Sequence, residues 1–413
     1  MASLPASPVT AAEVAATRRP VDRASLLPPR VFHDPAVLAF EQAAWFGRSW
    51  VYVGREEDVD RPGRYLLAEV AGQSLIVIRG EDDVVRAFHN VCRHRGAQLC
   101  TEPSGRLVRF QCPYHAWTYD LDGRLRRANH TDTLIDFDPS QFGLVPARSA
   151  LWHGFLFVSL DPDVPDLARS MADLWQHIDR FPLADLRRAR RIEYAVNANW
   201  KVIGENYSEC YHCPGVHPQL NRLTPYDKGE NIESNGPWCG GWMELRDDFD
   251  TMSVDGLRHG RPPLPGVTAA DERRIYYFLA WPNLLLSLHP DYLMTHQVWP
   301  VEPGRSRVVC EWFFHPDTMA QPDFDPADAV DFWDLTNRQD WAVCELQQRG
   351  TASVAYTPGR YSLMEDMVHA FDLMLADGYA ADGVTTRFAP RHDKWRQPRL
   401  VPTEGVVRES HAR

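Results

Sequence analysis

The chain has 413 residues and a formal net charge of -12 at pH 7. A length beyond what one hydrophobic core usually serves predicts two domains. The acidic balance excludes nucleic acid and an anionic membrane as main partners, because both select for clusters of Lys and Arg. No apolar run approaches the length that crosses a bilayer, and the start, MASLPASPVTAAEVAATRRP, lacks the apolar core of a secretory signal. We therefore expect a cytoplasmic protein.

The first part of the chain predicts one helix followed by a small antiparallel sheet. Apolar residues recur at helical spacing from Val37 to Trp50. From Tyr65 the sequence changes to short stretches typical of β-strands, separated by turns, and this pattern ends near Asp163. The predicted strands lie at residues 65–70, 74–79, 84–91, 106–112 and 116–120.

The second part predicts a larger antiparallel sheet and one long helix. A strand at 191–198 leads into a helical stretch, residues 199–213, which a Pro-Gly pair interrupts. Residues 326–350 have an amphipathic pattern that predicts a helix ending at Gly350. The chain after about Thr385 has the composition of a polar surface tail. Further strands are predicted at residues 274–281, 283–289, 292–300 and 306–314.

Two loops of the first sheet combine a cysteine with a histidine. The pattern is Cys92-x-His94 and, further on, Cys112-x2-His115. Two thiolates and two imidazoles fit either tetrahedral zinc or an iron-sulfur cluster of mixed ligation. Zinc ribbons usually present paired cysteines, so this arrangement favours a diiron cluster with both cysteines on one iron and both histidines on the other.

The stretch CRHRGAQLCTEPSGRLVRFQCPYHAWTYDLDG resembles the Rieske domain of the bacterial ring-hydroxylating and N-demethylating oxygenases. The resemblance implies a [2Fe-2S] cluster held by Cys92, His94, Cys112 and His115. Ala97 and Tyr114 stand where Rieske proteins of the respiratory chain carry the cysteines of an additional disulfide. The low-potential oxygenase type is therefore implied.

A second centre is indicated in ENYSECYHCPGVHP, because a Rieske cluster alone moves one electron. Glu209 and His212 have the i, i+3 spacing of one helix face, and the Pro-Gly break lets His217 converge on the same point. Two histidines and a carboxylate form the facial triad of a non-heme Fe(II) oxygenase. The long helix offers the carboxylates of Asp331, Asp334, Asp340 and Glu345.

The stretch NWKVIGENYSECYHCPGVHP resembles the iron-binding stretch of the same family. The resemblance implies Fe(II) bound by His212, His217 and Asp340. It also implies that Glu209 is not a ligand, but links His212 to His115 of a neighbouring subunit, which requires an oligomer, expected to be a homotrimer. Glu205, one turn earlier, is expected close to the iron, where it tunes the groups around the metal.

The carboxylate at position 209 also bears on the substrate. Most ring dioxygenases carry Asp at this position, whereas Glu is typical of the branch with choline monooxygenase and the glycine betaine, stachydrine and carnitine enzymes. This favours a quaternary or N-methylated ammonium substrate, which prefers aromatic faces and a carboxylate. The alternative substrate is an aromatic acid, hydroxylated by a ring dioxygenase. Candidate substrate residues are Trp238, Trp242, His289, Asp291, Tyr292 and Tyr356.

The resemblance implies an α+β fold in three parts: residues 1–43, a tail and helix that join the catalytic domain; residues 44–163, the antiparallel β Rieske domain; and residues 164–413, a helix-grip catalytic domain in which an antiparallel sheet wraps around a long helix. It further implies O2 as co-substrate and NAD(P)H oxidised by a separate flavin- or ferredoxin-type reductase, since no dinucleotide-binding turn is present.

Six cysteines remain outside the cluster motif. Cys210 and Cys213 have the spacing of a redox Cys-x-x-C pair, but we interpret them, together with Cys100, Cys239, Cys310 and Cys344, as buried thiols without a role in the chemistry. A third hypothesis is an electron carrier or zinc-stabilised binding protein without turnover. It requires that the residues around His212 bind no iron.

Overall fold

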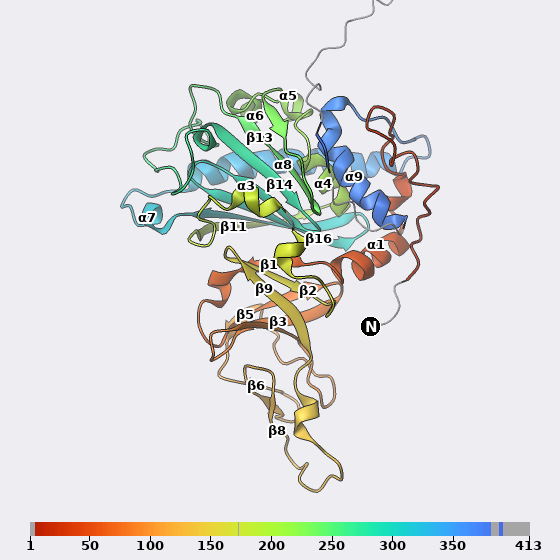
Figure 1. Cartoon of the computed structure of the whole chain (residues 1–413), viewed down its shortest axis with the longest axis vertical. Coiled ribbons are helices and arrows are strands. Elements are labelled where there is room, and N and C mark those ends of the chain that lie inside the picture. Colours follow the sequence, from red (N-terminus) through yellow and green to blue (C-terminus); the bar gives the residue numbers. More distant parts are fainter. Residues whose placement is uncertain (1–4, 172, 381–387, 391–413) are drawn as a thin grey trace, which may run out of the picture.

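The computed structural model describes residues 5–171, 173–380 and 388–390. The tail expected after Thr385 therefore lies almost entirely outside the described residues. Figure 1 shows two lobes stacked along the long axis of the molecule, a narrow β lobe and a wider lobe of sheet and helices. This is the predicted pairing of a small sheet domain with a larger α+β domain.

The narrow lobe consists of two antiparallel sheets. Seven strands follow the order β1-β10-β9-β4-β3-β2-β5, and a separate small sheet has the order β6-β7-β8. The two loops with the Cys-x-His and Cys-x2-His motifs flank β5 and β6. The bounds are β1 Val51–Arg55, β2 Arg64–Val70, β3 Gln73–Arg79, β4 Val85–His89, β5 Ser104–Arg106, β6 Phe110–Gln111, β7 Thr118–Tyr119, β8 Leu125–Arg127, β9 Pro146–Trp152 and β10 Phe155–Ser159.

The wider lobe is built on a second antiparallel sheet, with the order β11-β17-β16-β15-β14-β13-β12. Each strand from β12 to β17 pairs with its neighbour in the sequence, so the sheet is a meander that β11 completes at the far edge. The bounds are β11 Arg187–Val196, β12 Gly229–Asn231, β13 Trp238–Glu244, β14 Arg274–Ala280, β15 Leu284–Leu288, β16 Leu293–Glu302 and β17 Arg305–Phe314.

Helices cover this sheet, and the longest of them is the predicted one. α8 spans Ala327–Thr351, so it passes Gly350 by one residue. The other helices are α1 Pro35–Glu41, α2 Leu167–Ser170, α3 Leu174–Ile178, α4 Trp200–Tyr207, α5 Cys213–Val216, α6 Pro218–Leu223, α7 Pro316–Met319 and α9 Asp366–Tyr379, and the short turns are η1 Pro29–Phe32, η2 Gln42–Phe46, η3 Glu56–Val59, η4 Pro139–Phe142, η5 Asp271–Arg273 and η6 Leu363–Glu365.

The sheet of the wider lobe is buried on both faces, which explains its nearly continuous apolar strands. On β15, Leu285 packs into the core shared with α4, α8 and α9, whereas Leu284 and Leu286 pack on the opposite face with α2, α3 and the adjoining strands β1 and β10. Side chains alternate between faces with a period of two. One face therefore receives the long helix, and the other receives the narrow lobe.

The N-terminal helix joins the wider lobe, as expected. Asp34 caps α1 by accepting a hydrogen bond from the N–H of Ala36, and Pro35 occupies the first helical position. Glu41 at the end of α1 is fully buried and accepts a hydrogen bond of 2.7 Å from the ammonium group of Lys201 on α4. The helical pattern expected as far as Trp50 ends at Phe46, because the chain turns at Gly47.

One of the two expected domain limits falls between elements of the structure, and the other falls within a short turn. The limit after residue 163 lies between β10 and α2, and that after residue 43 lies inside η2. Within the described ranges, no helix is both long enough and apolar enough to span a membrane.

Candidate metal centres and substrate cavity

The two cysteine-histidine loops have the same backbone conformation. In each loop the cysteine N–H donates to a carbonyl five residues later, that of Ala97 or Trp117, and the cysteine carbonyl accepts from an N–H four residues later. Each loop contains one residue with a left-handed backbone, Gly96 with φ +74° and Ala116 with φ +55°. Two equivalent loops thus present a cysteine and a histidine each, as a cluster with two ligands from each loop requires.

The side chains of the loops fit a mixed-ligand cluster. Cys92 and Cys112 are buried, and the rings of His94 and His115 lie 4.7 Å apart. The Nδ1 atom of His115 is buried without a hydrogen-bond partner, which leaves its lone pair available for a metal. The hydroxyl of Tyr119, itself fully buried, lies 3.3 Å from the Sγ atom of Cys92.

The segment that contains the second group of ligands differs from the sequence prediction. The helix expected over residues 199–213 ends at Tyr207, and Glu209 and His212 lie in the turn between α4 and α5. Their proximity therefore does not come from one helix face. Glu209 accepts from the backbone N–H of His212 at 3.1 Å, which closes the turn. Pro214 does not break a helix but lies in the first turn of α5, where its missing N–H costs nothing.

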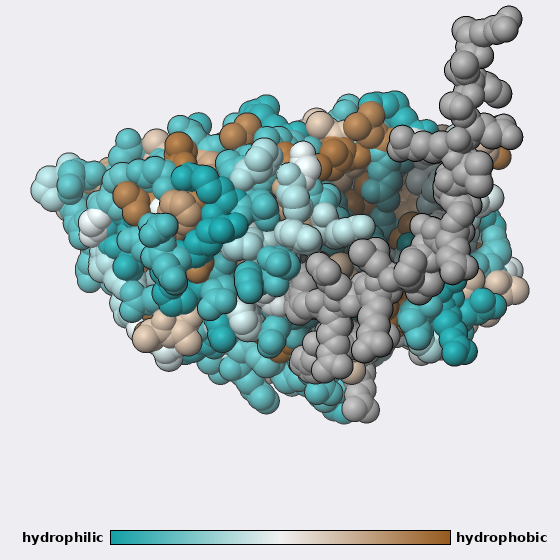
Figure 2. Space-filling view, turned by 90° about the horizontal axis from the view of Figure 1, so that it is seen from above, coloured by the Kyte–Doolittle hydropathy of each residue, from teal (hydrophilic) through white to brown (hydrophobic). Residues whose placement is uncertain are grey.

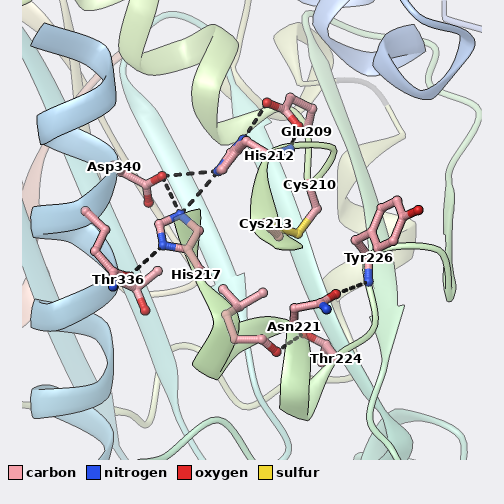
Figure 3. Close-up of a disulfide and its surroundings, with 12 residues drawn as sticks. Glu209, Cys210, His212, Cys213, His217, Asn221, Thr224, Tyr226, Thr336 and Asp340 are labelled. Atoms are coloured by element: carbon pink, nitrogen blue, oxygen red, sulfur yellow. Dashed lines mark hydrogen bonds and ion pairs between the residues drawn. A yellow bond between two sulfur atoms is a disulfide. The ribbon is translucent and has the colours of Figure 1, made fainter. Parts of the chain in front are cut away.

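His212, His217 and Asp340 form the one group of three metal-binding side chains found among the described residues, with ligand atoms within 4.8 Å of one another. Figure 3 shows the two histidines beside α5 and the aspartate on α8 directed at one point. The Nε2 atoms of the histidines face each other at 3.2 Å, and that of His217 lies 2.8 Å from Oδ1 of Asp340. Two imidazole nitrogens and a carboxylate converging in this way match the donor set of non-heme iron.

The ionisation of this group follows from its mutual contacts. Burial disfavours the charged form of His212, but hydrogen bonds to Asp340 and Glu209 outweigh it and raise the pKa of His212 to about 10. Burial likewise opposes ionisation of Asp340, but hydrogen bonds from both histidines lower its pKa to about 2. A metal ion bound at this point competes with the proton on His212, so its binding depends on pH.

The outer nitrogen of each histidine has its own partner. Nδ1 of His212 lies 2.5 Å from Glu209, and Nδ1 of His217 lies 2.8 Å from Oε1 of Gln339. Gln339 is held in turn by the side-chain amide of Gln219 at 2.6 Å. These contacts fix the tautomer in which Nε2 of each ring is free to bind a metal. The sequence analysis missed Gln339, although its position directly before Asp340 was a signal.

Cys210 and Cys213 correct the interpretation of the remaining cysteines. They form a disulfide across the turn that holds His212, and are not free thiols. The prediction of free buried thiols is right for Cys100, Cys239, Cys310 and Cys344. The Cys-x-x-C spacing was the signal that indicated a pair.

A cavity of about 120 Å³ lies beside the three ligands. Its walls include the acidic side chains of Glu209, Glu230 and Asp340, while none of its described lining residues is Lys or Arg. The space-filling view of Figure 2 shows brown apolar side chains gathered around a hollow in this end of the molecule. Its aromatic lining comprises Tyr207, Tyr211, Tyr226, Trp242, Tyr277, Trp333 and Trp341.

Of the six candidate substrate residues, the structure places Trp242 alone in the cavity wall. One face of its ring is occupied by the guanidinium group of Arg274, which lies 3.8 Å from the ring centre. Asp291 forms a buried ion pair with Arg261 at 2.8 Å. Trp238, His289 and Tyr292 are fully buried in the core, and Tyr356 is half-buried outside the cavity. The structure therefore brings one of the six candidates to the cavity, and the other five stay outside its wall.

Glu205 lies away from the cavity wall. Its carboxyl group accepts a hydrogen bond of 2.8 Å from the side-chain amide of Gln347 and contacts the carboxyl group of Asp372 on α9. Burial raises the pKa of Glu205 to about 7. Asp372 is fully buried and has an oxygen without another partner. Burial raises the pKa of both carboxyl groups, and the carboxyl group of Glu205 lies between α4 and α9 instead of facing the ligand group.

Comparison with known proteins agrees with this geometry. The family model "Rieske [2Fe-2S] domain" matches residues 49–138, and "Ring hydroxylating alpha subunit (catalytic domain)" matches residues 183–381. The chain is 34% identical to the glycine betaine monooxygenase oxygenase subunit of Chromohalobacter salexigens, over 81% of either chain. The chain belongs to the Rieske non-heme iron oxygenases. In this family the two domains contain a [2Fe-2S] cluster and a mononuclear iron, and the zinc alternative is thereby excluded.

Other relatives belong to the same group of oxygenases. The carnitine monooxygenase oxygenase subunit of Escherichia coli is 34% identical over 82% of this chain and 87% of its own. Choline monooxygenase of Arabidopsis thaliana is 29% identical over 86% of this chain and 83% of its own. The quaternary ammonium Rieske monooxygenase CntA with L-carnitine has the same fold, with a TM-score of 0.74, 24% identity and 90% of this chain covered against 99% of its own.

Proposed function

We propose that this Rieske oxygenase hydroxylates or N-demethylates a small quaternary ammonium compound. In this proposal Cys92, His94, Cys112 and His115 hold the [2Fe-2S] cluster, and His212, His217 and Asp340 hold Fe(II). The observation that carries the proposal is the convergence of the three iron ligands on the edge of an aromatic, acidic cavity.

The cavity supports a cationic substrate. A methylated ammonium group is attracted to aromatic faces, and the cavity wall includes Tyr226 from the loop after α6, Tyr277 from β14 and Trp333 from α8. The carboxylate of Glu230 adds negative charge to the same wall. We assign the binding of the cation to these four side chains, and the names of the relatives point to the same class of substrate.

The alternative, a dioxygenase of aromatic acids, is not favoured. The carboxylate of such a substrate needs a cationic partner when it leaves water. The described cavity wall offers neither Lys nor Arg, and it already contains three acidic side chains. An aromatic anion therefore meets repulsion where a quaternary cation meets attraction.

Glu209 is proposed to connect the two metal centres between subunits. Figure 1 shows β6 and β8, next to the second cluster loop, at one end of the molecule and α5 at the other. One chain thus keeps its own centres apart, whereas a ring of three copies brings the cluster end of one subunit to Glu209 of the next. A carboxylate that accepts from His212 and from His115 of the neighbouring subunit fixes both rings and provides a short hydrogen-bonded route for the electron.

The residues of this chain position the substrate and control access of water and protons to it. When bound, the two iron centres supply the activation of dioxygen and the electrons for it. Hydroxylation of one C–H bond consumes one O2, two electrons and two protons, and releases one water. The aromatic wall holds the cation with an N-methyl group toward the three ligands and excludes water. If the N-methyl carbon is hydroxylated, the product decomposes to formaldehyde and the demethylated amine.

The electrons are proposed to come from NAD(P)H through a separate flavin- or ferredoxin-type reductase. The relatives are named as oxygenase subunits, which supports a second component in their systems. We also propose a cytoplasmic location for this protein, because NAD(P)H, the proposed source of its electrons, is held in the cytoplasm.

The test is single-turnover oxidation by purified protein loaded with iron and reduced by dithionite. Glycine betaine, choline, carnitine, stachydrine and benzoate are compared for oxygen uptake and formaldehyde. We expect substrate-linked oxygen uptake with a quaternary ammonium compound and none with benzoate. Glu230→Gln is expected to raise KM with little change in kcat, since it removes attraction for the cation, whereas Glu302→Gln at an exposed site serves as control. Oxidation of benzoate alone would overturn the proposal.

A further inference from the structure

The disulfide between Cys210 and Cys213 encloses the turn on which the iron site depends. The pair brackets His212, and Cys210 directly follows Glu209. Both cysteines line the cavity beside the ligands. The other described cysteines form no disulfide, and two of them, Cys92 and Cys112, are assigned to the cluster, so this pair is the one disulfide among the described residues.

Disulfides are rare in the cytoplasm, where those that form are usually catalytic or respond to oxidants. We propose that Cys210 and Cys213 form a redox-active pair that determines how firmly the turn holds iron, and that hydrogen peroxide released in the adjoining cavity oxidises it. The proposal rests on the proposed function, because the oxygenase supplies the oxidant.

The chemistry balances with peroxide as the oxidant. Dioxygen that takes up two electrons and two protons without oxidising substrate becomes hydrogen peroxide, and an oxygenase with iron held by His212, His217 and Asp340 would supply these electrons beside the disulfide. The thiolate of one cysteine attacks a peroxide oxygen, the O–O bond breaks, and water leaves after protonation, which gives a sulfenic acid. The second thiol then displaces the sulfenic oxygen, the S–S bond forms, and a second water leaves. Two thiols and one peroxide thus yield one disulfide and two waters.

The mechanical consequence follows from the contacts of the turn. Besides the disulfide, hydrogen bonds hold the turn: the backbone N–H of Cys213 donates to the carbonyl of Cys210 at 3.1 Å, and that of His212 donates to the carboxylate of Glu209 at 3.1 Å. Each such hydrogen bond contributes only about 1 kcal/mol, so without the disulfide the segment between Glu209 and α5 opens more readily. The disulfide ties both ends of that segment together, so His212 and its partner Glu209 keep the positions that converge with Asp340.

The test measures thiols and iron without turnover. Holoprotein is treated with hydrogen peroxide or with dithiothreitol, and free thiols are mapped by alkylation and mass spectrometry. We expect peroxide to remove the thiols of Cys210 and Cys213 before any other. Iron loss to a ferrous chelator is then followed in both states, and we expect the reduced form to lose mononuclear iron about tenfold faster, the lower end of what disturbing a ligand's orientation costs.

Variants separate the disulfide from a general loss of structure. Cys210→Ser, Cys213→Ser and the double variant are expected to lose iron at the fast rate under either treatment, with the visible spectrum of the Rieske cluster unchanged as a check of folding. Cys239→Ser, at a buried free cysteine in β13, is expected to behave as wild type. Equal iron loss in the two states, or thiols that resist peroxide, would overturn this inference alone. A wild-type protein that binds no mononuclear iron in either state would overturn the proposed function as well.

Discussion

Tyr119 shows how a single hydroxyl acts on the Rieske centre. Its O–H lies 3.3 Å from the sulfur of Cys92, and it also accepts from the backbone N–H of Arg93 at 3.0 Å. A hydrogen bond to a cluster sulfur stabilises the electron-rich reduced state and raises the reduction potential. We predict that Tyr119→Phe lowers the midpoint potential by about 40 mV, the one-electron equivalent of one hydrogen bond of about 1 kcal/mol. A potentiometric titration followed by EPR measures it, with the exposed Tyr114→Phe as control.

Gln339 acts on the second centre in a comparable way. It accepts from the Nδ1–H of His217 and so directs the Nε2 lone pair toward the metal. We predict that Gln339→Leu lowers the affinity for mononuclear iron by about 10- to 100-fold, because the ring loses the partner that fixes its orientation. Iron content after dialysis against a chelator measures the change. Gln321→Leu, at an exposed glutamine, should keep its iron, and unchanged retention in the Gln339 variant would contradict this role.

Candidate ligands of both centres could be proposed from the sequence, because metals restrict the types and spacing of their ligands. Cys92, His94, His212 and His217 lie in two short motifs that can be identified without a fold. Gln339 and the residues of the cavity wall could not be proposed from the sequence, because glutamine and tyrosine side chains have many different roles in proteins. Which of them reaches the metal or the substrate depends on how separate elements pack.

At the scale of elements, one buried ion pair joins the N-terminal helix to the catalytic lobe. Glu41 of α1 accepts hydrogen bonds from Lys201 and from the indole of Trp200, both on α4, at 2.7 Å each. Glu41→Gln leaves the buried ammonium of Lys201 without a counter-charge. We predict a loss of about 3–5 kcal/mol in stability, seen as a clearly lower melting temperature in calorimetry. Glu302→Gln, which removes an exposed pair with Arg305, should cost less than about 1 kcal/mol.

The carboxyl pair between α4 and α9 makes stability depend on pH. Burial raises the pKa of Glu205 to about 7, and burial together with Glu205 raises that of Asp372. The folded protein therefore keeps protons that the unfolded chain has released. This contribution is fully present below the ordinary carboxyl pKa and is lost as pH rises through 7. We predict that the melting temperature falls between pH 5 and 8, by the equivalent of about 3 kcal/mol.

A variant tests the source of this pH dependence. Glu205→Gln keeps a hydrogen-bonding group at the position but does not ionise, so its melting temperature should change little over the same range. It should exceed that of wild type at pH 8. Glu69→Gln, at an exposed site on β2, should retain the wild-type slope. A slope that persists in the Glu205 variant would assign the effect to other groups.

The elements themselves were largely predictable, and the exceptions have local causes. The long helix α8 and the strands β14 to β17 follow from regular apolar patterns. The helix expected through residue 213 ends at Tyr207, because the carboxylate of Glu209 hydrogen-bonds the next turn and competes with the helical backbone. The cavity arises from the order of β12, β13 and β14, which bring Glu230 and Tyr277 to one wall. That order depends on long-range pairing, which no local pattern contains.

At the scale of the whole molecule, the separation of the two centres predicts that activity depends on pairs of chains. Cys112→Ser is expected to abolish the cluster and leave the iron site, whereas Asp340→Ala abolishes the iron site and leaves the cluster. Each variant alone should be inactive. In a mixed oligomer, an intact cluster can meet an intact iron site across an interface, so co-expression should restore activity.

The expected recovery can be calculated from the arrangement of a closed ring. An interface is competent only when the electron-donating subunit has an intact cluster and the next subunit has an intact iron site. With equal amounts of the two chains, each condition is met half of the time, so about one quarter of the interfaces are competent. Substrate-linked oxygen uptake by the unfractionated mixture, in which the two differently tagged chains are shown to be present in equal amounts, measures this recovery. Electron transfer confined to a single chain would give no activity at any mixing ratio. Recovery near a quarter would instead require that the cluster of one subunit pass its electron to the iron site of another.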